Sequence, residues 1–340
     1  MNEAQLLEAA RAGDEDAFAR LVEAHRGALH AHCYRMLGSV PDAEDALQEA
    51  LLSAWRGLPG FEGRSSLRSW LHAIATNACL RALERRPKRV LPIDYAPPAD
   101  PHDGLGAPLV ESVWVQPYPD EALGLEEGLA GPEARYEQRE SIELAFIAAL
   151  QHLPARQRAV LILRDVLGFS AREVAEVLET TPAGVDSALQ RAHKAVDERL
   201  PERSQQALLR SLDDQRFREI VEGFVDAWER ADVEAVVAML TSDGAMTMPP
   251  LPTWYRGHEA VTAFLEGIAL RRGQRWRLVP ARANGQPAFG KYLWDEERQA
   301  FAPHSISVLT LEGPAIAEIT TFLDPELIPR FGLPDAIDVR

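Results

Sequence analysis

The residues from Asp42 to Arg89 contain two consecutive stretches in which apolar side chains recur every three or four positions. That spacing places the apolar side chains on one face of a helix, so the chain must contain two amphipathic helices here. The first has an acidic opposite face, formed by Asp42, Glu44, Asp45, Gln48 and Glu49. The second carries basic residues and is followed by more of them, up to Arg89. An acidic helix beside a basic one indicates a protein partner on one side and nucleic acid on the other.

A loop with an aromatic residue, Leu58-Pro59-Gly60-Phe61, connects DAEDALQE to SSLRSWLHAIATNACL. This combination resembles region two of the extracytoplasmic-function type sigma factors of bacterial RNA polymerase. The resemblance implies that the acidic face binds core polymerase. It also implies that the loop and second helix engage the opened downstream promoter element, where aromatic stacking and cationic side chains suit single-stranded DNA. The residues implied in this DNA contact are Phe61, Arg64, Arg68, Trp70, Asn77, Arg81, Arg85, Arg86 and Lys88.

The charge of the chain argues against tight DNA binding by the free protein. Its net charge is −16 at pH 7, whereas independent nucleic-acid binders are usually basic. The distribution is uneven, because residues 64–89 carry seven Arg or Lys and one Glu, and residues 95–140 carry two Arg and ten Asp or Glu. We therefore expect binding to promoter DNA only together with core polymerase.

Bulk properties bound the class of protein. A length of 340 residues allows two or three domains. We expect no transmembrane helix, because no run of about 18 apolar residues is present. The acidic N-terminus is unlike a secretory signal. The two cysteines, Cys33 and Cys79, predict neither a disulfide framework nor a metal cluster. We expect a cytoplasmic protein without metal or cofactor.

Composition divides the chain into four parts. We expect a helical domain at 1–94, a linker at 95–135 rich in acid, Pro and Gly, a second helical domain at 136–202 and a third domain at 213–332. The segment from Trp114 to Pro119 is too aromatic for a plain spacer. It either anchors the linker locally or forms a turn packed on a neighbouring domain.

The second helical domain contains a helix-turn-helix pattern. Ser170 to Glu173 form a capping box, and Thr180-Thr181-Pro182 end one helix and begin the next. LPARQRAVLILRDVLGFSAREVAEVL resembles sigma region four, which implies that the helix from Pro182 to Val196 reads the upstream promoter element. The implied DNA contacts are Arg172, Thr181, Ala183, Ser187, Gln190, Arg191 and Lys194. Gly184 and Asp186 depart from this expectation, since Gly weakens a helix and Asp repels phosphate.

The third domain begins with helices and continues with four strand-like runs between residues 275 and 323. WERADVEAVVAMLTSDGAMTMPP and YRGHEAVTAFL resemble the opening of the SnoaL-like domain, the conical α+β fold shared with ketosteroid isomerases. The resemblance implies an apolar cavity, for which Trp254, Tyr255, Trp294 and His304 are candidate wall residues. Asp243, His258, His304 and Asp324 are candidate bases, although their spacing defines no catalytic pair.

The resemblances to sigma regions two and four and to the SnoaL-like domain imply two all-α domains followed by an α+β domain, in a sigma factor that directs promoter-specific initiation. Its fused C-terminal domain would modulate activity without being an enzyme, and its partners would be core RNA polymerase and promoter DNA. A small-molecule ligand and an anti-sigma protein are candidate further partners. Two alternatives stay open: a DNA-binding regulator fused to an isomerase or cyclase domain, and a helix-turn-helix activator that leaves promoter melting to another factor.

Overall fold

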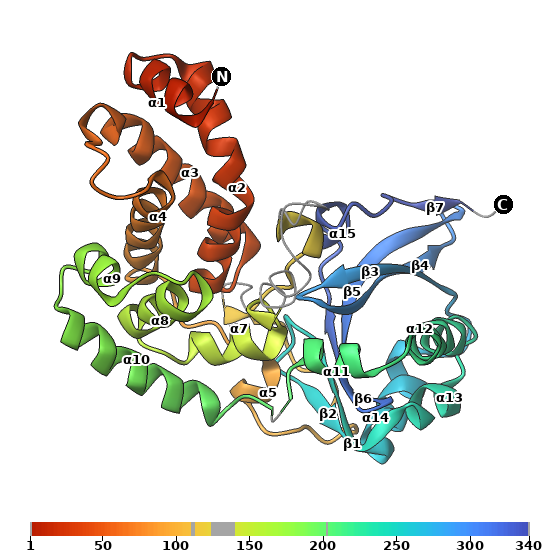
Figure 1. Cartoon of the computed structure of the whole chain (residues 1–340). Helices are drawn as coiled ribbons and strands as arrows, with labels where there is room; N and C mark the ends of the chain where they lie inside the picture. The colour runs from red at the N-terminus through yellow and green to blue at the C-terminus, as the bar shows by residue number, and fades with distance from the viewer. Residues whose placement is uncertain (1, 110–112, 124–139, 202, 339–340) are drawn as a thin grey trace. The chain divides into compact units, whose positions relative to one another are not determined.

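The computed structural model describes residues 2–109, 113–123, 140–201 and 203–338 (Figure 1). These residues form two compact units. One consists of residues 1–89 with 121–200, and the other of residues 90–120 with 201–340. The expected boundary between linker and second helical domain, near residue 135, lies outside the described residues.

The N-terminal part of the first unit is helical, as its apolar periodicity predicts. Its elements are α1 (Glu3–Arg11), α2 (Glu15–Leu37), α3 (Val40–Gly57), a 3-10 turn (Leu58–Gly60) and α4 (Leu67–Leu83). Local capping sets the boundaries: the Asp14 side chain caps α2, Gly38 ends it in the left-handed conformation, and Ser39 caps α3.

The helix-turn-helix prediction is confirmed in the later part of the same unit. The elements are α7 (Leu144–Gln151), α8 (Ala155–Leu161), a π-helical turn (Ile162–Val166), α9 (Ala171–Val177) and α10 (Pro182–Asp197). Ser170 and Glu173 form the expected capping box at the start of α9. The glycine at position 184 is explained by local packing, because a Cβ there would lie 2.9 Å from the Thr180 hydroxyl oxygen. A larger residue at this position would therefore require the side chain of Thr180 to shift.

The second unit is a curled sheet covered by helices (Figure 1). Its strands are β1 (Leu240–Thr247), β2 (Trp254–Arg256), β3 (Trp276–Ala283), β4 (Gln286–Asp295), β5 (Ala300–Glu312), β6 (Ala315–Phe322) and β7 (Ile337–Asp338). They follow the order β2-β1-β6-β5-β4-β3, and β7 pairs with β5. The β1–β6 pair is parallel, whereas the other pairs are antiparallel. The four strand-like runs predicted between residues 275 and 323 correspond to β3 to β6.

The second unit also contains helices, most of which share one buried apolar cluster with the sheet. They are α5 (Pro92–Tyr95), α11 (Gln205–Ser211), α12 (Asp214–Glu229), α13 (Val233–Ala238), α14 (His258–Phe264), a π-helical turn (Leu265–Ala269) and α15 (Leu327–Arg330). Phe224 and Trp228 of α12 and Phe289 of β4 belong to one buried apolar cluster. This cluster is the core between helices and sheet, and the sequence predicted its helical stripe.

Residues 90–120 pack within the second unit instead of forming an extended spacer. Trp114, Val115 and Tyr118 are at most 2% exposed. The main chain of this segment bonds to the domain at several points, among them Ala99 N–H to Trp254 O (2.8 Å) and Leu109 N–H to Pro250 O (2.9 Å). The aromatic stretch is therefore buried on the domain and is not a plain spacer. The 3-10 turn Asp120–Leu123 follows it.

Candidate functional site

The acidic face of α3 is presented to solvent along most of its length. Asp45, Gln48 and Glu49 are exposed and Glu44 is half-buried. Leu52, one turn further along the helix, is 57% exposed. The exposed part of α3 therefore combines carboxylates with an apolar residue, a composition suited to contact with another protein.

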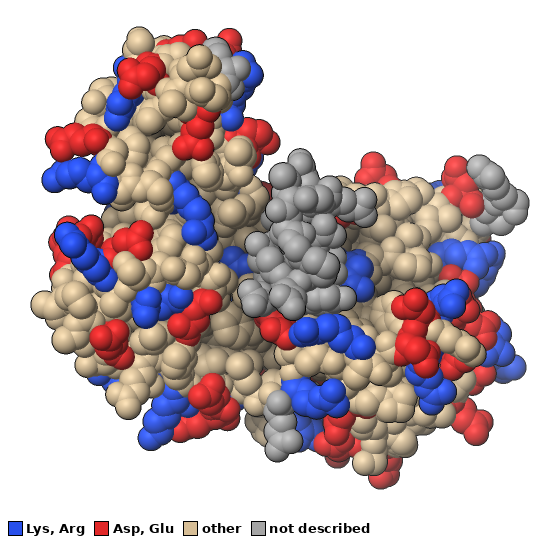
Figure 2. Space-filling view, viewed as in Figure 1, with Lys and Arg blue, Asp and Glu red and all other residues tan. Residues whose placement is uncertain are grey.

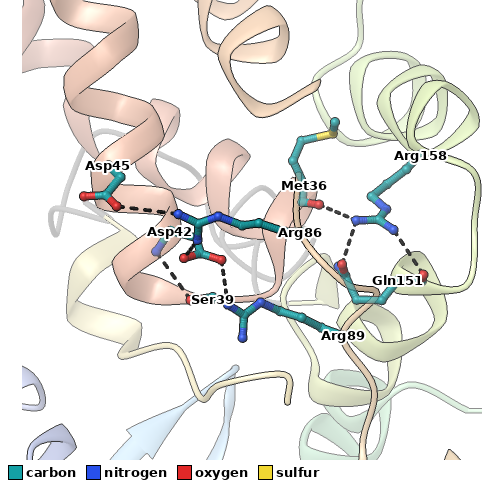
Figure 3. Close-up of polar contacts among 8 residues, drawn as sticks. All are labelled: Met36, Ser39, Asp42, Asp45, Arg86, Arg89, Gln151 and Arg158. Atoms are coloured by element: carbon teal, nitrogen blue, oxygen red, sulfur yellow. Dashed lines mark hydrogen bonds and ion pairs between the residues drawn. The ribbon is translucent and has the colours of Figure 1, made fainter. Parts of the chain in front are cut away.

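Asp42 differs from the rest of this face, because its side chain is only 9% exposed and is held by two arginines (Figure 3). Arg89 donates to Asp42 Oδ2 at 2.6 Å and is itself 7% exposed. Arg86 contacts the other carboxylate oxygen and also reaches Asp45 at 3.8 Å. Burial lowers the pKa of Arg89 to about 10. The two predicted sets, acidic for polymerase and basic for DNA, are thus joined through Asp42 and Arg86.

The predicted downstream-DNA residues fall into exposed and engaged groups. Arg64, Asn77 and Arg85 are exposed. Arg68 donates to Leu167 O at 3.0 Å, and Arg81 donates to Glu49 at 2.7 Å. The Arg81–Glu49 ion pair is exposed, and such pairs are weak, so Arg81 stays accessible to phosphate.

Phe61 is buried and Lys88 already contacts another side chain, so neither is freely available to DNA. The Phe61 ring is 8% exposed and packs on Trp70, with 4.8 Å between ring centroids. A base can stack on Phe61 only after the loop opens. Lys88 Nζ lies 2.7 Å from His152 Nδ1, so this lysine contacts the later part of the helical unit.

Buried polar contacts join the two helical parts of the first unit (Figure 3). Arg158 of α8 is 4% exposed, bonds to the carbonyl of Met36 and donates to Gln151 Oε1 at 2.6 Å. Arg35 donates to the Ser141 hydroxyl at 2.7 Å. Burial lowers the pKa of Arg158 to about 10. The sequence signal that could have located this contact is an arginine within the apolar run RQRAVLIL.

Helix α10 presents its predicted DNA-reading face to solvent. Ala183, Ser187, Gln190, Arg191 and Lys194 are all exposed, and so is Thr181 at its N-cap. Val185, Ala192 and Val196 are buried on the opposite face. Arg172 of α9 is exposed and pairs with Glu176 at 3.2 Å. On the face in Figure 2, acidic and basic side chains are interspersed, in keeping with the expectation of weak DNA binding by the free chain.

The second unit contains a cavity of about 210 Å³ with mostly apolar walls. Of the residues predicted as walls, His304 lines it, whereas Trp254, Tyr255 and Trp294 are not among its lining residues. Trp254 donates to Ala96 O at 2.7 Å, Tyr255 stacks on Phe264, and Trp294 lies beneath Arg275. Alternation along a strand could not distinguish side chains that line the cavity from those that fill the core.

The candidate bases Asp243, His258 and Asp324 do not line the cavity either. Asp243 accepts from the Thr241 hydroxyl at 3.1 Å, and Asp324 accepts from Glu326 N–H at 2.9 Å. Sequence reasoning missed Lys291, which lines the cavity from β4. Its neighbours in PAFGKYLW are apolar, and a lone lysine in such a strand is the signal that could have found it.

The sequence also led us to expect no metal cluster, no disulfide framework and no transmembrane helix. No cluster of metal-ligating side chains occurs among the described residues. Cys33 and Cys79 are both buried and free of disulfides. None of the helices in the described ranges is long and apolar enough to cross a membrane.

Comparison with known proteins identifies the three parts. The family models Sigma-70 region 2, Sigma-70 region 4 and SnoaL-like domain match residues 21–89, 143–196 and 221–319. The ECF RNA polymerase sigma factor SigG of Mycobacterium tuberculosis is 39% identical over 329 residues, which cover 96% of this chain and 86% of SigG. SigM of the same organism is 34% identical over 56% of this chain and 81% of its own length. The chain belongs to the ECF RNA polymerase sigma factors.

A solved structure shows the same fold. The crystal structure of the M. tuberculosis extracytoplasmic function sigma factor SigJ aligns with a TM-score of 0.59 at 22% identity, covering 93% of this chain and 99% of SigJ. The helical regions followed by a SnoaL-like α+β domain are therefore a recurring arrangement.

Proposed function

We propose that this chain is a sigma subunit that binds core RNA polymerase and directs initiation at particular promoters. The observation that carries this proposal is the similarity to SigG across nearly the whole chain, which includes the two sigma regions and the SnoaL-like domain. A polymerase subunit works where the polymerase is, so we place its action in the cytoplasm.

Within this proposal, the exposed part of α3 binds the polymerase. Glu44, Asp45, Gln48 and Glu49 supply the acidic face, and the exposed Leu52 supplies apolar area at its side. Asp42 has a different role, because its carboxylate is buried against Arg89. It holds the start of α3 to the segment after α4 and acts on polymerase binding through the position of that helix.

Promoter DNA is contacted by two separate surfaces. The accessible cations of α4 and the following segment, with Trp70 and Phe61, meet the opened downstream element. The exposed face of α10 meets the upstream element in the major groove, where Ser187 and Gln190 can bond to base edges. Arg172, Arg191 and Lys194 are suited to phosphates.

Run-off transcription with purified core polymerase and a pool of promoter fragments tests the sigma activity. We expect specific transcripts from the full chain and a strong loss with Asp45→Arg, since the reversed charge faces the partner. Glu23→Arg, an exposed charge reversal on α2, is the matched control and should transcribe normally. If core polymerase neither binds the chain nor makes transcripts with it, the sigma proposal is wrong.

We further infer that the C-terminal domain modulates this activity through residues 90–120, since this segment joins the two sigma regions in sequence and is held by the domain. Loosening the segment should change transcript yield without changing the promoter selected. The domain acts in this proposal as a regulatory module and not as an enzyme. Asp243, His258 and Asp324 lie outside the cavity lining, which supports that choice. Turnover of an isomerase or cyclase substrate that is lost in Asp324→Ala would overturn it.

A further inference from the structure

The cavity of the C-terminal domain combines apolar walls with one amine. Met246, Met248, Leu251, Phe264 and Leu323 supply much of its apolar surface. At about 210 Å³ it is smaller than the ~300–1,000 Å³ of typical drug-sized sites, so it suits a small ligand. Among the described residues that line it, none is Asp or Glu.

Lys291 enters this cavity from β4 and is 1% exposed. Its Nζ lies 3.1 Å from the centroid of the Trp228 ring and 5.6 Å from that of Phe224. Within the described part of the chain, Nζ has no hydrogen-bond partner. A buried ammonium without a counter-charge is costly, and burial accordingly lowers the pKa of Lys291 well below its ordinary value.

A β-bulge brings two more polar side chains to the amine. Lys291 pairs with Ser305 on β5, whereas the next residue, Tyr292, pairs with Pro303. His304 is therefore the extra residue of the bulge. Successive residues of a regular strand point to opposite faces, but a bulge re-aims a side chain, and both His304 and Ser305 line the cavity. The His304 Nδ1 and Ser305 Oγ atoms are 3.0 Å apart.

Two further wall residues have polar atoms without a hydrogen-bond partner among the described residues. These atoms are Trp228 Nε1 and Gln274 Oε1, both buried. Buried polar atoms are almost always bonded, so three such atoms on one cavity mark a place where a ligand completes the bonding. Two of the three, Lys291 Nζ and Trp228 Nε1, are nitrogens that donate.

We propose that this cavity binds a small apolar monocarboxylic acid, with its carboxylate beside Lys291 Nζ and its hydrocarbon part against the apolar walls. A carboxylate supplies the negative charge that the lining lacks, and ammonium–carboxylate bonds are among the strong ones. The ionised ligand favours the ammonium form, so binding raises the pKa of Lys291 and is coupled to net proton uptake from solvent. No covalent bond forms.

The site is also connected to the segment between the two sigma regions. Leu105 of that segment lines the cavity, and the Thr253 hydroxyl donates to its carbonyl oxygen. Occupancy therefore changes the packing of residues 96–109. This link deepens the proposed regulatory role, but binding itself is measured without polymerase and does not depend on sigma activity.

Isothermal titration of the full chain with hexanoate and phenylacetate, and with hexanol and 2-phenylethanol as matched neutral probes, tests the proposal. We expect each acid to bind at least about tenfold more tightly than its alcohol. Titration in two buffers that differ in ionisation enthalpy should reveal proton uptake with the acids alone. Hydrogen exchange of residues 96–109 should slow when an acid is bound.

Lys291→Met replaces the amine with an apolar side chain of similar length and should keep the fold. It should abolish the preference for acids and the proton uptake, whereas Arg298→Met, at an exposed cation in the turn between β4 and β5, should change neither. Equal binding of acid and alcohol to the unmodified chain, or binding of neither, would overturn the proposal regardless of how the variant folds. Borohydride trapping of an aldehyde on Lys291, with no acid binding, would overturn it in favour of a carbonyl ligand.

Discussion

Tyr118 and Asn284, 166 residues apart in sequence, hold each other by two reciprocal hydrogen bonds. The Tyr118 N–H donates to Asn284 Oδ1 at 2.8 Å, and the Asn284 N–H donates to the Tyr118 carbonyl at 2.9 Å. Asn284 has a φ of 55°, which asparagine tolerates better than most residues. Next to it, Gly285 N–H donates to Asp120 at 2.7 Å. The turn between β3 and β4 therefore binds the end of the segment that joins the two sigma regions.

Asn284→Gly keeps the backbone conformation but removes the acceptor of the buried Tyr118 N–H. An unsatisfied buried donor costs about 1–3 kcal/mol, so we expect faster hydrogen exchange at residues 113–119 and an altered transcript yield. Gln299→Gly is the control, because this exposed residue has a φ of 50° in another turn of the sheet. Unchanged exchange in Asn284→Gly would show that this turn does not hold the segment.

Asp42→Ala should destabilise the helical unit, because it removes the carboxylate that Arg89 contacts in the interior. Breaking a buried ion pair costs on the order of 3 kcal/mol. Urea unfolding of the variant would measure this loss. Asp45 has a side chain that is 72% exposed, so Asp45→Ala should change the unfolding free energy by less than about 0.5 kcal/mol. Equal stability of the two variants would contradict this role of Asp42.

Acid should destabilise the helical unit through His32 and His72. The Thr76 hydroxyl donates to the carbonyl of His72, so it accepts from His32 Nε2, and His72 Nδ1 donates to Arg68 O. The remaining ring nitrogens, His32 Nδ1 and His72 Nε2, are buried without a hydrogen-bond partner among the described residues. Protonating them is unfavourable: burial lowers the pKa of His72 to about 4 and that of His32 well below 6.5.

The folded pKa of His72 thus lies below its unfolded value, and the unfolded chain takes up protons first as the pH falls. The contribution of His72 to the unfolding free energy is fully present above pH ~6.5. It falls by roughly 2–4 kcal/mol as the pH is lowered to ~4. Urea unfolding followed by circular dichroism at several pH values measures this slope. His72→Gln should reduce it, whereas a change at the exposed His102 should leave it unchanged.

Two substitutions on α10 should separate base reading from phosphate binding in the polymerase holoenzyme. Gln190→Ala should cost about 1–3 kcal/mol at one promoter position and relax the preference there. Lys194→Ala should weaken all promoters similarly and reduce the salt dependence of binding by about one phosphate contact. If both variants shift all promoters equally, Gln190 does not read a base.

Local structure could be predicted from sequence with good accuracy. Helix caps act between residues that are about three positions apart, so the sequence around each helix start includes both partners. The caps at Asp14, Ser39, Ser170 and Thr181 are examples. The outward face of α10 follows from the same helical period. Family resemblance extended this reading to the order of the two sigma regions and the conical domain.

The partners of polar side chains depended on the tertiary structure. Nothing near Asp42 in sequence indicates that Arg89 lies against it, and the docking of residues 90–120 joins positions more than 150 residues apart. The apolar neighbours of Lys291 in sequence set it apart, but its burial depends on the bulge, Trp228 and the apolar walls that only the folded chain assembles around it. Helix caps and apolar periodicity depend on residues close together in sequence. The burial of a charged side chain depends on which helices and strands pack against each other, and that is determined only in the folded chain.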